Sequence, residues 1–311
     1  MGETPVVFLM GPTGAGKSAA AFAIGARLPV EVISVDAAQI YRHLDVGTAK
    51  PSRAERRLVP HHLIDIRHVS ETYSAANFIS DASGLIGACL RRGRIPLLVG
   101  GTSFYFHALE HGLPHTPPAD PKLRQRLADR AAREGWAALH AELRLRDPQA
   151  AARIAPTDRQ RIQRALEIVL TQGRIPSRSA GSGLPHRILK LAVAPADRAL
   201  LHERIALRFR RMVARGLLEE AAWLHEQELD PGLPALRLVG YRQAGEYLRN
   251  KIPYNEFVEQ GVAATRQLAK RQLTWLRADS EVCWFDSTKS DVGPLCADSI
   301  EAAVVGGDAK H

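Results

Sequence analysis

The sequence predicts an α/β protein built on a parallel sheet that is flanked by helices, with an inserted basic helical domain. Over roughly the first 100 residues, short apolar runs typical of buried strands alternate with segments of helical spacing. A glycine-rich loop joins the first apolar run to the first helix. A proline-rich break then leads into an Arg- and Ala-rich stretch with few β-branched residues, which indicates helices outside the sheet.

The predicted elements of the first part follow the chain in order. Val6–Met10 is an apolar strand, and Ser18–Arg27 is the helix that leaves the loop. Val30–Val35 and Ile95–Val99 are two more buried strands, with a helix over Tyr73–Arg92 between them. Because ligands collect at the carboxyl ends of parallel strands, the residues that follow these strands are expected to share one crevice.

The break is Leu113–Pro121, which contains four prolines. We expect helices over 121–172, a loop over 173–185, and no strong pattern after residue 286, where the tail is expected to be mobile. Two further strands and three helices are predicted: Leu189–Ala194, Val282–Asp286, Arg198–Ala214, Leu217–Gln227 and Tyr254–Arg277. The predicted domains are a core of residues 1–114 and 189–311 and a helical insertion of residues 115–188.

The loop after the first strand matches the pattern G-x-x-x-x-G-K-[ST], which makes the core a P-loop α/β core. Its residues are Gly11, Pro12, Thr13, Gly14, Ala15, Gly16, Lys17 and Ser18. Backbone N–H groups of such a loop converge on an anion, Lys17 adds a positive charge, and the Ser18 hydroxyl can hold Mg²⁺. The pattern predicts a phosphate or diphosphate ligand without specifying ATP, and a tight structural turn is the alternative.

Two other strand ends carry candidate residues. Asp36 follows Val30–Val35 and could bind Mg²⁺ through water or act as a general base, or it could simply close a turn. Gly100–Thr102 allows close backbone approach to a ligand, or forms only a tight turn. This strand end lacks the metal-holding aspartate of many P-loop nucleotide hydrolases, which argues against ordinary ATP hydrolysis.

Basic charge predicts a polyanionic partner. The net charge is +9, and residues 121–180 hold 13 Lys and Arg against six Asp and Glu. Arg204, Arg208 and Arg211 recur on one helix face, which could neutralise a leaving diphosphate or could be an ordinary solvated face. Gln160–Arg164 and Lys270–Arg277 mix basic, amide and aromatic side chains suited to RNA, although surface charge alone would look similar.

Other classes of protein fit the sequence poorly. Cys89, Cys283 and Cys296 are too few and too widely spaced for a disulfide framework or a zinc site, and the histidines fit no compact metal signature. No apolar run approaches the ~20 residues that a membrane span needs, and the chain starts without a signal segment. We therefore expect a cytoplasmic protein with no membrane partner.

Several stretches together resemble the tRNA dimethylallyltransferases (tRNA isopentenyltransferases) of the bacterial type. They run through nearly the whole chain in family order: 11–18, 33–41, Asp45–Pro51, His61–Asp65, 97–102, Asp158–Arg161, Arg237–Arg242 and Thr265–Gln272. Asp45–Pro51 and Thr265–Gln272 are far more specific than the P-loop. One departure is Ala37, where the family usually has Ser.

The resemblance implies transfer of a dimethylallyl group from dimethylallyl diphosphate to N6 of adenosine 37 in the anticodon stem-loop of tRNA. Asp36 matches the family's catalytic aspartate and would take the proton from N6. Lys17, Arg208 and Mg²⁺ near Ser18 would stabilise the departing diphosphate, and Thr13 would donate to its bridging oxygen. A monomer is expected.

The resemblance also implies a set of tRNA contacts. They are Asp36, Ala37, Ala38, Gln39, Thr102, Arg124, Gln160, Arg161, Ile162, Gln163, Arg164, Arg237, Leu238, Val239, Gly240, Tyr241, Arg242, Lys270, Arg271, Gln272, Leu273, Thr274, Trp275, Leu276 and Arg277. Two alternatives from other classes stay open: a P-loop kinase of small molecules, which would turn over ATP without tRNA, and a non-catalytic RNA-binding protein.

Overall fold

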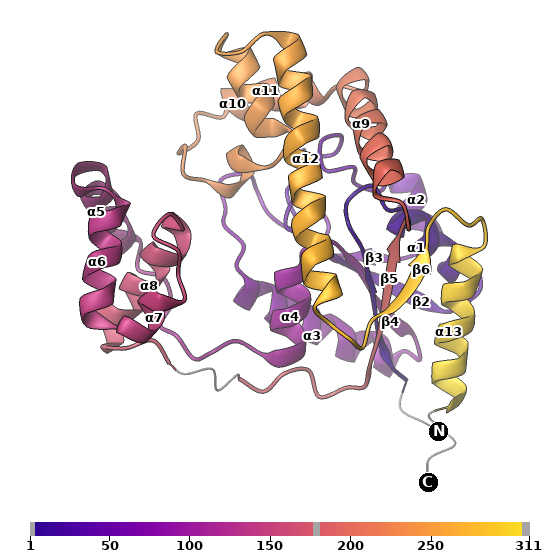
Figure 1. Ribbon diagram of the computed structural model, residues 1–311. Helices are drawn as coiled ribbons and strands as arrows, with labels where there is room; N and C mark the ends of the chain where they lie inside the picture. The colour runs from indigo at the N-terminus through magenta and orange to yellow at the C-terminus, as the bar shows by residue number, and fades with distance from the viewer. Residues whose placement is uncertain (1–3, 177–180, 307–311) are drawn as a thin grey trace. The chain divides into compact units, whose positions relative to one another are not determined.

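The computed structural model describes residues 4–176 and 181–306, and its ribbon is drawn in Figure 1. The chain forms two compact units, one of residues 1–110 with 184–311 and one of residues 111–183. The chain therefore passes between the units at 110/111 and 183/184, a few residues before the positions that the sequence suggested. Each unit has an apolar core of its own.

The first unit contains a six-stranded sheet in the order β3-β2-β4-β1-β5-β6, and every neighbouring pair is parallel. The strands are β1 (Val6–Met10), β2 (Val30–Val35), β3 (His61–His62), β4 (Ile95–Gly100), β5 (Ile188–Ala194) and β6 (Cys283–Asp286). Along β1, Val6 and Phe8 face one apolar core while Val7 and Leu9 face the other. Both faces of the sheet are therefore covered, and the predicted fold class is confirmed.

One face of the sheet is covered by α1 (Lys17–Gly25) and α13 (Val292–Gly306), which pack against each other (Figure 1). Cys296 and Ile300 of α13 are fully buried in this core. The expectation of a mobile tail without strong pattern after residue 286 is therefore wrong over α13. Small apolar residues predominate along this helix, and its polar residues are few, chiefly Asp298, Ser299 and Glu301, so its sequence shows only a weak amphipathic pattern.

The opposite face is covered mainly by α3 (Ala75–Arg91) and α4 (Ser103–His111), through buried aromatic rings such as Phe78, Tyr105 and Phe106. The same core continues into the helices that follow β5. These are α9 (Arg198–Ala214), α10 (Leu217–Glu226), the short η1 (Pro234–Arg237), α11 (Tyr241–Leu248) and α12 (Tyr254–Arg277). The sequence did not predict α4, α11 or the short α2 (Arg53–Leu58).

The second unit is a bundle of helices: α5 (Pro121–Glu134), α6 (Trp136–Arg146), α7 (Pro148–Ala152) and α8 (Arg159–Gln172). Three of them begin at an aspartate whose side chain accepts a backbone N–H of the first turn: Asp120, Asp147 and Asp158. Leucines and one isoleucine from α5, α6 and α8 form its core. The prediction of helices over 121–172 is confirmed, while residues 177–180 of the predicted loop lie outside the described residues.

Among the described residues, no helix combines the length and the apolar character that crossing a bilayer requires.

Candidate active site

Three strand ends meet at one edge of the sheet. Gly100 at the end of β4 pairs with Val35 of β2 on one side and with Met10 of β1 on the other. Asp36, Gly101 and Gly11 come directly after these three residues. The strand order therefore places the three loops at the same end of the sheet, as the shared crevice predicted from the sequence requires.

The loop from Gly11 to Gly16 turns sharply from β1 into α1. Gly16 caps the helix with φ 96°, a left-handed conformation that a residue with a side chain would adopt only under strain. The Lys17 Nζ donates to the carbonyls of Gly11 and Pro12, each at 2.9 Å, so the lysine folds back over its own loop. The Ser18 hydroxyl is on an exposed residue at the start of α1.

Lys17 lies in a strongly charged environment. The pKa of its ammonium group is lowered to about 8, chiefly by burial and also by the positive charge of Arg208, while the carboxylate of Asp36 acts in the opposite direction. Burial also lowers the pKa of Arg208, against the charge of the same Asp36. These three groups come from the loop, from α9 and from the end of β2, and they act on one another electrostatically. Two cations and one carboxylate therefore share the edge of the sheet.

Asp36 is half-buried and fixed by its own turn. Its Oδ1 accepts the N–H of Ala38 at 2.9 Å and that of Gln39 at 3.4 Å. The Thr102 hydroxyl oxygen accepts the N–H of Ala37 at 3.1 Å, which ties the turn to the end of β4. Oδ1 therefore closes the turn, which is the structural role that the sequence suggested as an alternative for Asp36. Within the described part of the chain, Oδ2 has no hydrogen-bond partner, so this oxygen can receive a proton from a ligand.

Arg204, Arg208 and Arg211 do not form one functional face. Arg204 donates to the Ser287 hydroxyl at 3.0 Å and to the Ser287 carbonyl at 3.2 Å, so it fastens α9 to the segment after β6. Arg211 is exposed, whereas Arg208 is half-buried near Lys17 and Asp36. The three arginines therefore do not act together on the site, and that part of the prediction is wrong. Arg208 is the arginine of the three whose charge acts on Lys17.

Gln272 of α12 joins two of the loops, a role that the sequence did not predict. Its side-chain oxygen accepts the N–H of Thr13 at 2.9 Å, and its amide nitrogen donates to the Gly101 carbonyl at 2.8 Å. A Cβ at position 101 would lie 2.3 Å from that nitrogen, which explains the glycine there. Thr13 and Gln272 are 259 residues apart in the sequence, so no local pattern could reveal the contact.

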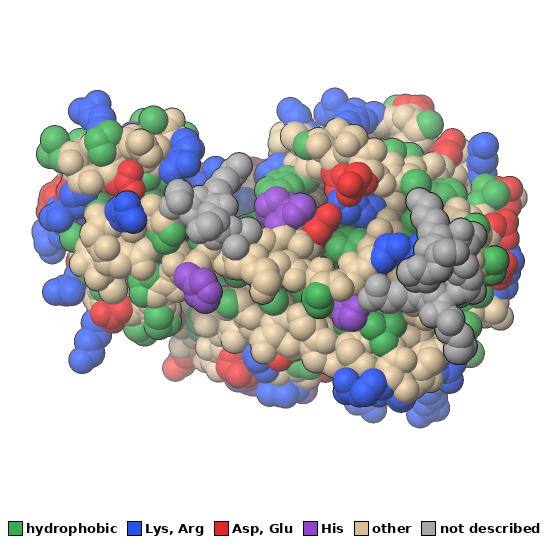
Figure 2. Space-filling model, turned by 90° about the horizontal axis from the view of Figure 1, so that it is seen from below, with side chains coloured by type: hydrophobic (Ala, Val, Ile, Leu, Met, Phe, Trp, Pro, Cys, Tyr) green, Lys and Arg blue, Asp and Glu red, His purple; other side chains and the backbone are tan. Residues whose placement is uncertain are grey.

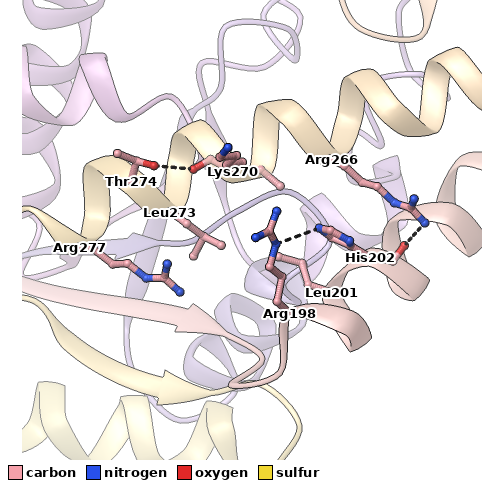
Figure 3. A pocket seen from close by; sticks show the side chains of 9 residues that line it. Arg198, Leu201, His202, Arg266, Lys270, Leu273, Thr274 and Arg277 are labelled. Atoms are coloured by element: carbon pink, nitrogen blue, oxygen red, sulfur yellow. Dashed lines mark hydrogen bonds between the residues drawn. The ribbon is translucent and has the colours of Figure 1, made fainter.

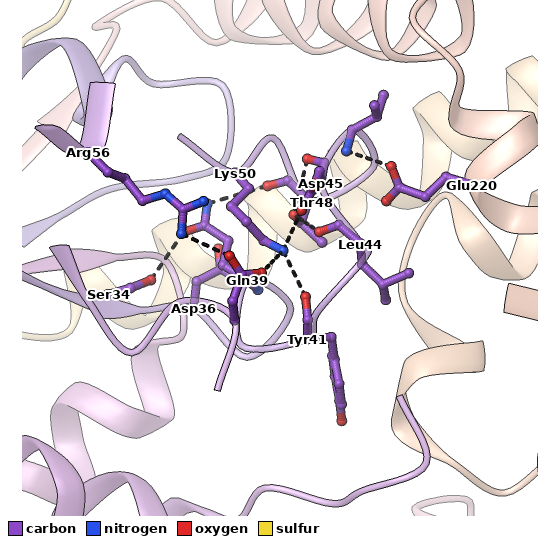
Figure 4. A network of polar contacts seen from close by, with 12 residues as sticks. Ser34, Asp36, Gln39, Tyr41, Leu44, Asp45, Thr48, Lys50, Arg56 and Glu220 are labelled. Atoms are coloured by element: carbon purple, nitrogen blue, oxygen red, sulfur yellow. Dashed lines mark hydrogen bonds and ion pairs between the residues drawn. The ribbon is translucent and has the colours of Figure 1, made fainter. Parts of the chain in front are cut away.

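The segment around Lys50 is held by ion pairs to the buried Lys50 side chain (Figure 4). Only 1% of the Lys50 side chain is exposed, and its Nζ contacts Asp45 Oδ1 and Asp65 Oδ1, each at 2.6 Å, and the Tyr41 carbonyl at 2.8 Å. Arg56 completes the group by binding the other oxygen of Asp65 at 2.8 Å. The Asp45 and Asp65 side chains remain 67% and 31% exposed, so the network compensates the buried Lys50 charge with carboxylates that reach the surface.

Some predicted tRNA contacts are buried. Tyr241 is fully buried, and its hydroxyl donates to Glu220, whose other oxygen accepts the N–H of Val46 at 2.7 Å. Ile162 is fully buried in the core of the second unit. Direct contact of these two side chains with tRNA is therefore wrong for this conformation, because each serves the packing of its own unit.

Basic side chains of the second unit differ in their surroundings. Arg124 binds Glu167 through two nitrogens, at 2.7 and 3.0 Å, and Arg164 binds the same carboxylate at 3.2 Å. Glu167 is only 2% exposed, so both arginines neutralise a buried charge. The Arg161 side chain is 68% exposed and forms an ion pair at the surface with Asp158, at 3.4 Å. Figure 2 shows Lys and Arg side chains spread over the face that it presents, interspersed with acidic ones.

Among residues 4–176 and 181–306, one group of side chains is close enough to hold a metal ion: Glu31, His62 and Cys89. Arg92 already occupies the Glu31 carboxylate through two nitrogens, at 3.1 and 2.7 Å, and holds the pKa of that carboxyl at about 2. Burial raises the pKa of the Cys89 thiol to about 11, which disfavours the thiolate that a metal needs. This group therefore fits an ion-pair network better than a metal site, and it does not fit Mg²⁺, which prefers oxygen ligands.

Comparison with known proteins identifies the family. The model of the IPP transferase family matches residues 39–279. The chain belongs to the IPP transferase family. As a member of that family it is a transferase.

Relatives match over nearly their whole length. A tRNA dimethylallyltransferase of Paraburkholderia phymatum is 50% identical over 97% of this chain and 98% of its own, and one of Bordetella pertussis is 52% identical over 96% and 98%. Among solved structures of the family, a tRNA isopentenylpyrophosphate transferase from Bacillus halodurans has a TM-score of 0.72 at 35% identity, covering 98% of this chain and 97% of that one. A eukaryotic dimethylallyltransferase acting on tRNA has a TM-score of 0.80 at 26% identity, over 97% and 79%.

Proposed function

We propose that this protein transfers a dimethylallyl group from dimethylallyl diphosphate to N6 of adenosine 37 in the anticodon stem-loop of tRNA. The observation that carries the proposal is the placement of Asp36 at the same sheet edge as the phosphate loop, within the electrostatic reach of Lys17 and Arg208. A carboxylate and two cations at one edge suit a reaction that removes a proton and releases an anion. The close relatives named for this activity support it.

Asp36 is the proposed general base. The exocyclic amine of adenine is a poor nucleophile and must lose a proton as the new C–N bond forms. The turn holds Oδ1 with two backbone N–H groups, so Oδ2 points in a fixed direction and keeps its lone pairs for N6. Adenosine 37 must leave its base stack to bring N6 to this oxygen.

The phosphate loop and its cations are the proposed site of the leaving diphosphate. Negative charge grows on that group as the allylic C–O bond breaks. Lys17 would exchange its two loop carbonyls for phosphate oxygens, and Arg208 would supply a second charge. The Thr13 hydroxyl would donate to the bridging oxygen, and the hydrogen bond from Thr13 N–H to Gln272 keeps this residue in place.

Mg²⁺ fits this loop as a partner of the diphosphate. The Ser18 hydroxyl is on an exposed residue at the first turn of α1, and a protein-bound Mg²⁺ commonly takes few protein oxygens beside those of phosphates and water. When bound, the ion would offset negative charge on the diphosphate.

The exposed basic residues are the proposed contacts for the tRNA backbone. Arg161, Arg237, Arg242, Lys270, Arg271 and Arg277 are all exposed. Such side chains neutralise phosphates and place the substrate, while base selection falls to groups near Asp36. A single chain supplies the base and both cations, so we propose a monomer, working on tRNA in the cytoplasm.

The test is to incubate the protein with unmodified tRNA and labelled dimethylallyl diphosphate and to follow label in the nucleoside. Label on N6 of adenosine 37 and release of diphosphate support the proposal. ATP turnover without tRNA would instead favour a small-molecule kinase, and tRNA binding without transfer would favour a non-catalytic RNA-binding protein. The end of β4 argues against the kinase, because Gly101 and Thr102 stand where such enzymes often place an acidic metal ligand.

A further inference from the structure

A cavity of about 110 Å³ lies between α9 and α12, apart from the phosphate loop (Figure 3). Its polar wall holds four cations, Arg198, Arg266, Lys270 and Arg277, together with His202 and Thr274. Its floor is apolar, formed by Leu201, Ala269 and Leu273. None of the lining residues is acidic. A small cavity walled by one sign of charge concentrates ions of the opposite sign.

The cations of this wall lack acidic partners, unlike arginines and lysines that belong to an ion-pair network. Within the described residues, none of Arg198, Arg266, Lys270 and Arg277 makes an ion pair. The Arg266 Nε is buried without any hydrogen-bond partner, and its Nη2 reaches only the His202 carbonyl, at 3.5 Å. A buried donor without an acceptor is costly, so the cavity lacks an acceptor oxygen at this position.

His202 shows the same excess of positive charge. Burial lowers the pKa of its imidazole, and the charges of Arg266 and Arg198 lower that pKa further. The Arg198 Nε lies 3.4 Å from the His202 Nε2, as Figure 3 shows. The imidazole is therefore a reporter inside the cavity that responds to any anion bound there.

The cavity is next to the proposed catalytic site but separate from it. A Cβ at Gly14 of the phosphate loop would lie 3.2 Å from Ile205 and 3.8 Å from Leu201. Leu201 also forms the floor of the cavity, so one apolar layer separates the two anion-binding features. An anion in this cavity would be held beside the phosphate loop without competing for it.

We propose that this cavity binds a phosphate group, namely a backbone phosphate of the tRNA substrate. The proposal rests on the proposed function for the identity of the polynucleotide. It extends the tRNA surface from α12 onto α9, with Arg198, His202 and Arg266 as residues that the sequence did not suggest. Arginine forks suit phosphate oxygens, and the buried Nε of Arg266 would gain its missing acceptor.

The first experiment follows the ring resonances of His202 by NMR during titration with inorganic phosphate. The His202→Gln variant identifies the His202 signal by its loss. The Arg198→Gln variant removes one of the cations that line the cavity. We expect saturable shifts in the wild type and at least fivefold weaker binding in Arg198→Gln. An unresponsive His202 signal overturns the phosphate site.

The second experiment measures tRNA binding against salt concentration. Arg198→Gln is compared with Arg210→Gln, which removes an exposed arginine of the same helix outside the cavity. We expect Arg198→Gln to lower the slope of log K against log salt by about one, and Arg210→Gln to leave it unchanged. Equal slopes in the two variants would overturn the assignment to tRNA.

A third measurement distinguishes a tRNA phosphate from a free phosphate compound in the cavity. It also tests the cavity separately from the proposed transfer reaction. Saturating tRNA should displace inorganic phosphate from His202, whereas phosphate that remains bound identifies a site for a free phosphate compound and overturns the tRNA assignment. Transfer of the dimethylallyl group is assayed separately. A wild-type protein without transfer would contradict the proposed function even if His202 still responds to phosphate and tRNA.

Discussion

The sheet edge of the first unit and the helical second unit both carry many charges, but they hold them differently. At the sheet edge, Lys17 and Arg208 are half-buried, and burial lowers the pKa of both against the opposing charge of Asp36. In the second unit, Arg161 faces solvent while Arg124 neutralises the buried Glu167. Enclosed charges act strongly on a reacting group, whereas exposed charges act mainly on encounter and are screened by salt. We therefore expect substitutions at the sheet edge to lower turnover, and substitutions of exposed arginines in the second unit to weaken tRNA binding.

The largest expected effect is that of Asp36→Asn. The substitution keeps an oxygen for the turn but removes the base, so we expect turnover to fall by roughly 10²–10⁴-fold with tRNA affinity nearly unchanged. Single-turnover transfer and tRNA binding are measured side by side. Asp230→Asn is the matched control, because Asp230 also closes a turn, with Gly232, but lies on an exposed loop. A near-normal transfer rate in Asp36→Asn would remove this residue from the chemistry.

Arg208→Gln should follow, with a loss of about 10²–10³-fold in the rate of transfer, because a charge near the departing diphosphate is removed. Arg211→Gln removes an exposed arginine of the same helix and should change the rate less than about twofold. Similar rates in the two variants would show that enclosure of Arg208 has no catalytic consequence.

The pH dependence of diphosphate binding tests the enclosure of Lys17. Its pKa of about 8 lies below the ordinary value, so the ammonium loses its proton as the pH rises through that value. We expect the Lys17 contribution to affinity to be complete well below pH 8 and to fall by about tenfold between pH 7 and pH 9. The measurement is the ratio of wild-type to Lys17→Ala affinities, which cancels the titration of diphosphate itself. A ratio constant over this range contradicts the lowered pKa.

Gln272→Leu should weaken diphosphate binding by at least about fivefold, since two hydrogen bonds of about 0.5–1.5 kcal/mol each hold the loop. The neighbouring Arg271 is exposed, so Arg271→Gln should instead weaken tRNA binding and leave diphosphate binding unchanged. Titration of each variant with each ligand gives the comparison. If both substitutions weaken only tRNA binding, Gln272 is a tRNA contact and not a positioning residue of the loop.

The smallest effect is expected in the second unit. Arg161→Gln should lower the salt slope of tRNA binding by about one without changing stability. Arg124→Gln should lower the free energy of unfolding of that unit, because Glu167 keeps only its contact with Arg164 among ion pairs. Chemical denaturation and tRNA titration are measured for both. A loss of stability in Arg161→Gln would show that its charge is structural.

Local patterns predicted much of the fold. Strands such as Val6–Met10 and Val30–Val35 were predicted at their observed bounds, because a buried parallel strand is a continuous apolar run between turns. The long helix Tyr254–Arg277 was predicted for its helical spacing. The pattern failed for α13, because its many small apolar residues give only a weak amphipathic pattern, and its buried side is set by packing against α1.

The parts of the candidate site that lie within one short segment of the chain were predictable from the sequence. The loop at Gly11–Ser18 and the aspartate after β2 were found from sequence, because strand, turn and helix start are adjacent in the chain. The partnership of Gln272 with Thr13 and the enclosure of Arg208 were not predictable. Both depend on where α12 and α9 lie against the loop, which is a matter of packing between distant segments.

The sequence by itself determined which groups are present: a glycine-rich loop that matches a phosphate-binding pattern, a carboxylate at a strand end and an excess of basic side chains. Only the tertiary structure decided which charges act together. It enclosed Arg208 and exposed Arg211 on the same helix, and it buried Tyr241 and Ile162 that a family pattern had assigned to tRNA. The physical reason is that the strength of a charge depends on its surroundings, and the surroundings are built by residues far apart in the chain.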